Sequence, residues 1–296
     1  MGEVRCIQGM TSEFLLLSLS WRGLPIKPHH LRAVADLNFN QWRGYLSEQL
    51  GESFFEFENK QPGWREKSEQ EWKWLEKNRA QVCYINSSDY PILLSRLENP
   101  PLALTYLGSP CWINRKGIAV VGSRQPDPST LTWLDQELAP MLAQPGCFSI
   151  SGGARGVDQK CHSVSLKTRT PTVSWMPSGL SQIYPKGFQQ WVSAIVEQGG
   201  AVVSTFSPMQ PMYKSQFHVR NRWIVGMANA VVIAEARLRS GTLLTAQIAI
   251  DEGKSMGVVP CSPMLPTGRG GLNLINDGAL MLRDRWDLRS LLNDSH

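Results

Sequence analysis

Short apolar runs alternate with helical patterns from residue 118 to near the end of the chain. The first two runs, 118–121 and 148–150, are each followed by a segment of helical periodicity, at 129–142 and 157–166. Strands that read as continuous apolar runs are buried on both faces, which is typical of a parallel sheet covered by helices. The pattern predicts a doubly wound α/β, Rossmann-like domain with a mainly parallel sheet.

The same alternation continues toward the C-terminus. It predicts strands at 171–175, 201–204, 230–234 and 256–259, and helices at 188–196, 219–228 and 242–250. In open sheets of this class, ligands bind beyond the carboxyl ends of the strands. Loops that follow these runs are therefore the first place to look for a site.

The first part of the chain reads differently. Its helical patterns lie at 13–19, 30–37 and 66–79. The prolines of Asn99-Pro100-Pro101 mark the passage to the sheet. We expect a small, mainly helical N-terminal domain with its linker over 1–105 and a Rossmann-like domain over 106–296.

Charge, cysteines and hydropathy narrow the class of protein. The net charge is +5, and the surplus lies in 110–296, with 18 Lys+Arg against 12 Asp+Glu, while 1–109 has 12 against 13. A basic excess of this size is compatible with a polyanionic partner.

The cysteines form no C-x-x-C pair, so neither a disulfide framework nor a zinc ribbon is indicated. They are Cys6, Cys83, Cys111, Cys147, Cys161 and Cys261.

The longest nearly apolar run, 223–236, is too short to span a bilayer, and the N-terminus lacks a signal core. We therefore expect a soluble protein of the reducing cytoplasm, with no membrane insertion.

Two glycine-rich turns, each with an arginine, follow the first two strands. They are Gly122-Ser123-Arg124 and 151–158, the latter containing Gly152, Gly153 and Arg155. Small residues let the backbone approach a ligand, and the next helix offers free amides to an anion. Guanidinium groups suit phosphate. We interpret these turns as a phosphate-facing rim, with Arg124 as the contact and Arg155 as the brace of its turn.

Neither a dinucleotide cofactor nor a catalytic centre is indicated. The fingerprint G-x-G-x-x-G is missing after Gly122. Asp158 could orient His162, one helical turn later, for acid-base work, but no serine or cysteine nucleophile with a supporting group accompanies them. A structural role in the first turn of the helix for Asp158, and a hydrogen-bonding role for His162, fit better. We predict no catalytic residue, no metal and no cofactor.

A third basic element combines a cation with aromatic rings at Tyr184-Pro185-Lys186-Gly187-Phe188. Lysine can meet a backbone phosphate, and an aromatic ring can stack on an unpaired base for about 1 to 3 kcal/mol. This mixture suits single-stranded nucleic acid. Packing of Tyr184 and Phe188 into the core is an equally good interpretation for the rings.

Two further segments add polar groups. Arg220-Asn221-Arg222 follows Phe217 in a helical pattern, and arginines at i and i+2 cannot face the same way, so one braces the fold while the other meets a ligand. Which does which stays open at this stage. Ser240-Gly241-Thr242 opens another helix and offers hydroxyl and amide donors, or a plain helix cap.

The motifs together resemble the DprA/Smf family of DNA-processing proteins, over residues 81 to about 282. Their order and spacing match as well. They are V-G-S-R at 121–124, S-G-G-A-R-G-V-D at 151–158, His162, Y-P-K at 184–186, F-x-x-R-N-R at 217–222, S-G-T-L-x-T-A at 240–246 and G-L-N-L-I-N-D-G-A at 271–279.

The resemblance implies a cytoplasmic, non-catalytic protein of natural transformation. Such a protein binds and protects incoming single-stranded DNA, loads RecA recombinase, and is a homodimer through an extended Rossmann domain. The N-terminal part would be its sterile-alpha-motif-like (SAM-like) region. By position, Arg124 and Lys186 would be the principal DNA contacts. The rest of the candidate site is Ser123, Gly152, Gly153, Arg155, Phe217, Arg220, Asn221, Arg222, Ser240, Gly241 and Thr242.

Several positions depart from the family pattern. Thr205 replaces the usual Glu, Gly187-Phe188 replaces polar residues, and Cys161 replaces a small alanine-like residue. We expect the missing carboxylate to alter the pocket, and the sequence to have no C-terminal winged helix. A small-nucleotide sensor or hydrolase remains the alternative function, with Glu235 and His162 as its supporting residues.

Overall fold

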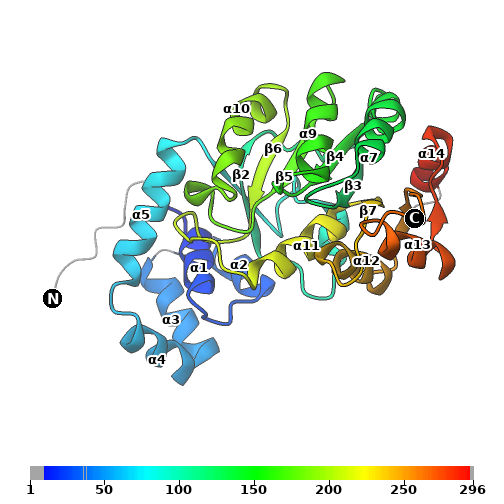
Figure 1. The fold of residues 1–296 in the computed structure, drawn as a ribbon. Coiled ribbons are helices and arrows are strands. Elements are labelled where there is room, and N and C mark those ends of the chain that lie inside the picture. Colours follow the sequence, from blue (N-terminus) through cyan, green and yellow to red (C-terminus); the bar gives the residue numbers. More distant parts are fainter. Residues whose placement is uncertain (1–9, 36, 38, 294–296) are drawn as a thin grey trace.

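A single sheet organises the molecule, shown in Figure 1. The computed structural model describes residues 10–35, 37 and 39–293. Within them, nine strands lie in the order β1-β2-β6-β5-β4-β3-β7-β8-β9. The strands are β1 (Gln81–Tyr84), β2 (Ala103–Gly108), β3 (Lys116–Gly122), β4 (Cys147–Ser151), β5 (Thr172–Trp175), β6 (Ala201–Ser204), β7 (Ala230–Glu235), β8 (Ser255–Val258) and β9 (Leu280–Met281).

The six strands from β3 to β8 pair in parallel, and β9 pairs in parallel with β8. β4, β5, β6 and β7 are buried along their whole length, which is why their sequences are nearly continuous apolar runs. The predicted doubly wound, mainly parallel α/β fold is confirmed.

Helices cover both faces of the sheet, and alternate residues of β3 show it. Ile118 and Val120 belong to one buried cluster, with side chains of η1, α8, α9 and α14. Ala119 and Val121 belong to the opposite cluster, with α6, α11 and α12. The helices are α6 (Ile92–Ser95), α7 (Pro128–Trp133), η1 (Leu134–Leu138), α8 (Ala139–Leu142), α9 (Val157–Lys167), η2 (Leu180–Gln182), η3 (Lys186–Phe188), α10 (Gln189–Glu197), α11 (Gln216–Met227), α12 (Gly241–Asp251), α13 (Arg269–Asn276) and α14 (Arg285–Asn293).

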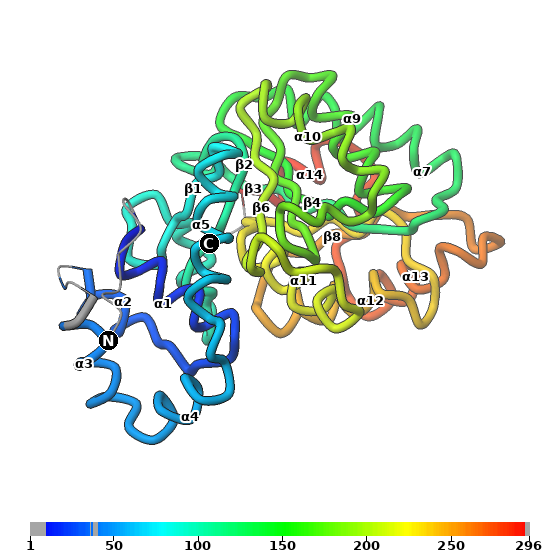
Figure 2. Tube along the Cα trace, turned by 90° about the vertical axis from the view of Figure 1, so that its left-hand side faces the viewer, coloured from blue at the N-terminus to red at the C-terminus, as the bar shows by residue number. Residues whose placement is uncertain are grey.

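The N-terminal helices form a separate buried cluster beside the β1 edge of the sheet, as Figure 2 shows. They are α1 (Ser12–Trp21), α2 (Pro28–Val34), α3 (Phe39–Leu50), α4 (Glu52–Lys60) and α5 (Trp64–Lys77). The predicted helices at 13–19 and 66–79 correspond to α1 and α5. The one at 30–37 ends earlier, at Val34, and residue 36 lies outside the described residues.

Buried polar contacts join these helices to the sheet domain. Glu71 on α5 is 3% exposed, forms an ion pair of 3.0 Å with Arg22, and accepts a hydrogen bond from Ser207. The indole of Trp21 donates to the backbone oxygen of Thr205. The loop after β6 is therefore held from the N-terminal side.

The sheet begins earlier in the chain than the expected boundary at residue 105. β1 and the first half of β2 lie before that boundary, and the two strands form the antiparallel edge, where Val82 pairs with Thr105 and Tyr106 with Val203. The segment expected to belong to the N-terminal domain and its linker thus supplies β1 and the start of β2. The division into domains at 1–105 and 106–296 stays a prediction.

None of the described helices has the length and apolarity that crossing a bilayer requires. The described cysteines are free thiols, four of them buried, whereas Cys6 lies outside the described residues. Burial raises the pKa of Cys161 to about 12, so that thiol is protonated at neutral pH.

Candidate nucleic-acid interface

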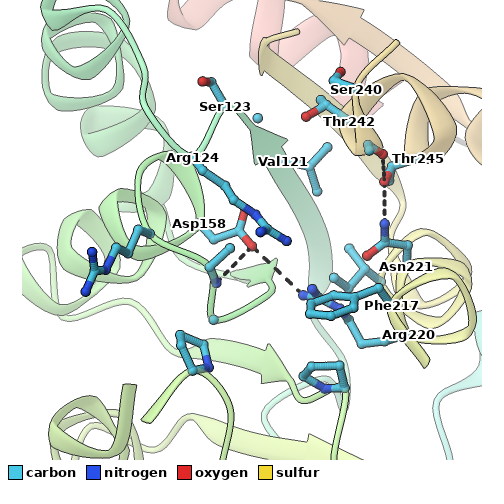
Figure 3. A pocket seen from close by; sticks show the side chains of 18 of the residues that line it. Val121, Ser123, Arg124, Asp158, Phe217, Arg220, Asn221, Ser240, Thr242 and Thr245 are labelled. Carbon is cyan, nitrogen blue, oxygen red and sulfur yellow. Dashed lines mark hydrogen bonds and ion pairs between the residues drawn. The ribbon is translucent and has the colours of Figure 1, made fainter. Parts of the chain in front are cut away.

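A cavity of about 850 Å³ opens at the carboxyl ends of β3, β4 and β7, where the topology predicts a site. Figure 3 shows it from close by. Its walls come from the loops after these strands, from the segment after β5, and from α11 and α12. The lining residues are Val121, Gly122, Ser123, Arg124, Gln125, Gly153, Ala154, Arg155, Asp158, Pro177, Tyr184, Pro185, Phe217, Arg220, Asn221, Ile224, Arg237, Ser240, Gly241, Thr242 and Thr245.

The two glycine turns pack against each other. Val157 donates its backbone N–H to the Ser123 oxygen at 3.1 Å. Gly156 has a φ of +82°, and a Cβ there would lie 2.4 Å from the same oxygen. Only glycine permits both the conformation and the approach. The turn after β4 therefore fixes where the Ser123-Arg124 backbone lies.

The floor of the cavity is a buried ion pair between Asp158 and Arg220, drawn in Figure 3. Asp158 is 7% exposed and Arg220 is 5% exposed. The Arg220 Nη1 atom lies 3.9 Å from the Asp158 carboxylate. A Cβ on Gly152 would lie 1.5 Å from the Arg220 Nη1 atom. Gly152 therefore makes the space that the guanidinium fills. Burial raises the pKa of Asp158 to about 6, while the Arg220 charge lowers it.

His162 lies beneath this floor, fully buried. Its Nε2 is 2.7 Å from the Gly152 oxygen, and its Nδ1 is 2.8 Å from the Thr172 hydroxyl. Only the tautomer protonated at Nε2 donates to the carbonyl and accepts from the hydroxyl. Burial lowers the pKa of His162 to about 4. The predicted hydrogen-bonding role of His162 is confirmed.

The rim carries the exposed charge. The Arg124 guanidinium reaches from the end of β3 toward Phe217 on α11, 5.6 Å from the ring centroid, and Arg220 lies 5.7 Å from the same centroid. Tyr184 meets Phe217 edge to face at 5.9 Å. Among the described residues, Arg124 and Arg155 form no ion pair with a carboxylate. These two cations are therefore available to an anion.

The opposite wall is the start of α12. The Ser240 hydroxyl accepts from the Leu243 N–H, so it caps the helix as well as lining the cavity. Asn221 on α11 donates from Nδ2 to the Thr245 hydroxyl at 2.8 Å. That contact joins α11 to α12 across the cavity.

Most of the candidate residues come together here. Those lining the cavity are Ser123, Arg124, Gly153, Arg155, Phe217, Arg220, Asn221, Ser240, Gly241 and Thr242. Gly152 lies beneath, under Arg220. Lys186 is exposed in η3, directly after the lining residue Pro185, and is not itself part of the lining.

The roles of three arginines need correction. Arg155 is exposed, so the interpretation of Arg155 as the brace of its turn is wrong: Arg220 is the buried brace. Arg222 does not meet the cavity, because it lies two positions further on α11 and pairs with Glu252 at 3.0 Å. We expected one of Arg220 and Arg222 to brace the fold and the other to contact a ligand. Arg220 braces the fold, but Arg222 lies outside the cavity, so the second half of that expectation is wrong.

Sequence reasoning missed Arg237. It follows β7, is exposed, and lines the cavity. Its signal was present, because Glu235 ends a buried strand next to β3 and the rule about strand ends applies there too.

The departures from the family pattern lie away from the cavity. The Thr205 hydroxyl accepts from the Trp223 indole at 3.1 Å, and Phe188 and Cys161 are fully buried. We expected the missing carboxylate at position 205 to alter the pocket, but Thr205 is not among the residues that line the cavity. Of the two rings for which core packing was an alternative, Phe188 is packed in the core, whereas Tyr184 lines the cavity.

Glu235, one of the two residues that supported a small-nucleotide sensor or hydrolase, has a structural role. It is 1% exposed, and its Oε2 accepts from the Asp127 N–H and the Thr130 hydroxyl, both at 2.8 Å. The carboxylate thus fixes the loop that follows β3. The described residues also contain no group of three or more His, Cys, Asp or Glu side chains placed to hold a metal ion.

Residues 81–293 match the family described as DNA recombination-mediator protein A. The chain belongs to that family. The resemblance to DprA/Smf proteins is thereby confirmed, and the match begins at β1, so the family region includes the antiparallel edge of the sheet.

Named relatives agree. Smf from Borreliella burgdorferi is 32% identical over 221 residues, which are 75% of this chain and 69% of that protein. Against Smf from Escherichia coli the match spans 71% of this chain and 56% of the relative's length. The chain therefore covers only part of these relatives.

Two solved structures share the fold. DprA from Streptococcus pneumoniae has a TM-score of 0.76 at 23% identity, covering 95% of this chain and 98% of that one. DNA processing protein A from Helicobacter pylori has a TM-score of 0.63 at 26% identity, covering 74% and 98%, and was solved for its single-stranded DNA binding mode.

Proposed function

We propose that this family member binds single-stranded DNA in the cavity at the carboxyl ends of β3, β4 and β7. The observation that carries the proposal is the separation of charge: the acids near these strand ends, Asp158 and Glu235, are buried, while the arginines around the opening are exposed. The binding mode described for the Helicobacter pylori relative supports the choice of ligand.

Neither carboxylate near these strand ends forms an ion pair with an arginine of the rim. Asp158 faces Arg220 and accepts from the Ala154 N–H, and Glu235 accepts from Asp127 and Thr130. Arg124, Arg155 and Arg237 form no ion pair within the described part of the chain. A phosphate backbone that enters the cavity therefore meets three exposed arginines that no carboxylate holds in an ion pair.

An aromatic surface accompanies the cations. Phe217 is partly exposed, with the Arg124 and Arg220 guanidinium groups 5.6 and 5.7 Å from its ring centroid and Tyr184 at its edge. An unstacked base can pack on such a ring, which a paired base in a duplex cannot do. This feature favours single-stranded over double-stranded DNA.

The wider role is part of the same proposal. The protein acts in the cytoplasm as a non-catalytic homodimer that protects single-stranded DNA and passes it to RecA recombinase, in line with a family named for recombination mediation. Sedimentation of the pure protein tests the dimer. Strand exchange by RecA, with and without the protein, tests the mediator role.

The binding step is tested by fluorescence anisotropy with single- and double-stranded oligonucleotides of equal length. The variant Arg124→Gln/Lys186→Gln removes two cations, each worth about 0.7 in the logarithm of affinity at about 0.1 M salt, so we expect about 25-fold weaker single-strand binding.

The matched control is Arg169→Gln/Lys77→Gln, which removes one exposed arginine and one exposed lysine away from the cavity. The control should bind as the unmodified protein does. Equal binding of duplex and single strand, or equal loss in both variants, would reject the proposal.

A further inference from the structure

One basic segment beside the cavity is unexplained by the site described so far. Arg237, Leu238 and Arg239 form the loop between β7 and α12, and all three are exposed, Leu238 by 45%. Arg237 lines the cavity and Arg239 does not. Within the described residues neither arginine has an ion pair. The loop thus carries positive charge from the cavity to the surface beyond it.

The sheet places this loop in line with the glycine turns. β3 lies between β4 and β7, and Gly122 at the end of β3 pairs with Glu235 at the end of β7. Arg155, Arg124 and Arg237 therefore follow three neighbouring strand ends. Since neighbouring strands lie about 4.8 Å apart, these three strand ends span about 10 Å, and Arg239 lies two residues beyond Arg237.

The loop is anchored from behind by α13, through glycines of the motif at 271–279 and the residue before it. The Gly271 N–H donates to the Ala236 oxygen at 3.2 Å. A Cβ on Gly270 would lie 2.7 Å from that oxygen and 3.0 Å from the Arg237 oxygen. Glycine at these positions lets the helix touch the loop backbone, so the arginines extend from a fixed support.

We propose that Arg237 and Arg239 are further phosphate contacts, which continue the row of cations out of the cavity toward α12. The strand of DNA then crosses the ends of β4, β3 and β7 and leaves over the Arg237–Arg239 loop. A row that runs beyond the cavity fits a polymer and exceeds what a mononucleotide can occupy. This inference rests on the proposed function, because it extends the same DNA site.

The chain offers a close control for Arg239. Arg239 has a φ of +56°, and Arg169 has a φ of +55°. Both are exposed, but Arg169 precedes β5 and therefore lies at the amino ends of the parallel strands, whereas the cavity lies at their carboxyl ends. Substitution by Gln removes the same charge from the same backbone conformation in both cases, so backbone strain cannot explain a difference.

The test is anisotropy with oligothymidylates of about 5 and about 20 nucleotides, over a series of salt concentrations. For the longer strand, we expect Arg237→Gln/Arg239→Gln to weaken binding about 25-fold at about 0.1 M salt and to reduce the log–log salt slope by about 1.4. Arg239→Gln alone should weaken the longer strand about 5-fold and leave the shorter one unchanged. Arg169→Gln should change neither.

Two failures are distinguishable. If Arg124→Gln weakens binding while Arg237→Gln/Arg239→Gln matches Arg169→Gln, the extended row is wrong and the cavity remains the site. If Arg124→Gln also leaves binding unchanged, the proposed function itself fails.

Discussion

The floor and the rim of the cavity both contain arginine, yet the two groups of side chains differ in every respect that matters for binding. Arg220 in the floor is 5% exposed and faces Asp158, over the space that Gly152 leaves. Arg124 on the rim is exposed and forms no ion pair among the described residues, although both guanidinium groups lie within 6 Å of the Phe217 ring centroid. Burial with a counter-charge makes an arginine part of the fold, whereas exposure without one leaves it to a ligand.

The largest difference between floor and rim is expected when Arg220 is substituted. Arg220→Met leaves the Asp158 carboxylate buried without its partner, and we expect the free energy of unfolding to fall by about 3–5 kcal/mol. Urea unfolding at pH 7 measures it. Arg155→Met, on the rim, should change stability by no more than about 0.5 kcal/mol. Equal losses in the two variants would contradict the distinction between floor and rim.

The pH dependence of stability sharpens the description of the floor. The folded pKa of His162 is lowered to about 4, so its protonation destabilises the protein as pH falls from about 6.5 to 4. The folded pKa of Asp158 is raised to about 6, so its protonation stabilises the protein as pH falls from about 6 to 4. The two effects oppose each other.

Asp158→Asn removes the compensating group. Its free energy of unfolding should fall more steeply between pH 7 and pH 4 than that of the unmodified protein, by an amount on the order of 2 kcal/mol. Urea unfolding at a series of pH values gives both slopes. Parallel slopes would show that Asp158 does not titrate in this window.

On the rim, the aromatic contact is tested by Phe217→Ala. Loss of a stacking surface should weaken single-stranded DNA binding by about 1–3 kcal/mol, with little change for duplex DNA. Phe55→Ala is the control, since Phe55 is 51% exposed on α4, in the N-terminal helical cluster. Anisotropy that finds the same affinity for both variants would remove Phe217 from the interface.

The smallest effect is expected behind the floor, at Thr205. Thr205→Val takes the acceptor away from the Trp223 indole, which is buried, and should cost about 1 to 2 kcal/mol of stability. DNA affinity should stay unchanged, because Thr205 does not line the cavity. Thermal unfolding and anisotropy on one preparation check both statements; a loss of affinity at full stability would place Thr205 in the interface.

The sequence predicted the central strands well and the edges poorly. β4 to β7 are buried apolar runs, which periodicity identifies directly. β1 has four residues of mixed burial, and β9 has two exposed residues. Such short segments become strands only because a neighbouring strand pairs with them, and that information is not local.

For the site, the sequence identified the strand ends but not which cation is buried. The difference between Arg155 and Arg220 depends on the missing side chain of Gly152, which is far from Arg220 in the chain. Arg237 was overlooked because it lies outside the motifs that the sequence analysis singled out, between Glu235 and Ser240-Gly241-Thr242. Strand ends could be predicted from local pattern, while burial and charge pairing required the tertiary structure.

The central claim is that the rim cations bind the phosphate backbone of single-stranded DNA. The most direct test is the slope of log affinity against log salt for a single-stranded oligonucleotide, measured for the unmodified protein and for Arg124→Gln. With four or five phosphate contacts the slope should lie between about −2.8 and −3.5, and the variant should lose about 0.7 of it. A slope near zero, or one that Arg124→Gln leaves unchanged, would contradict the claim.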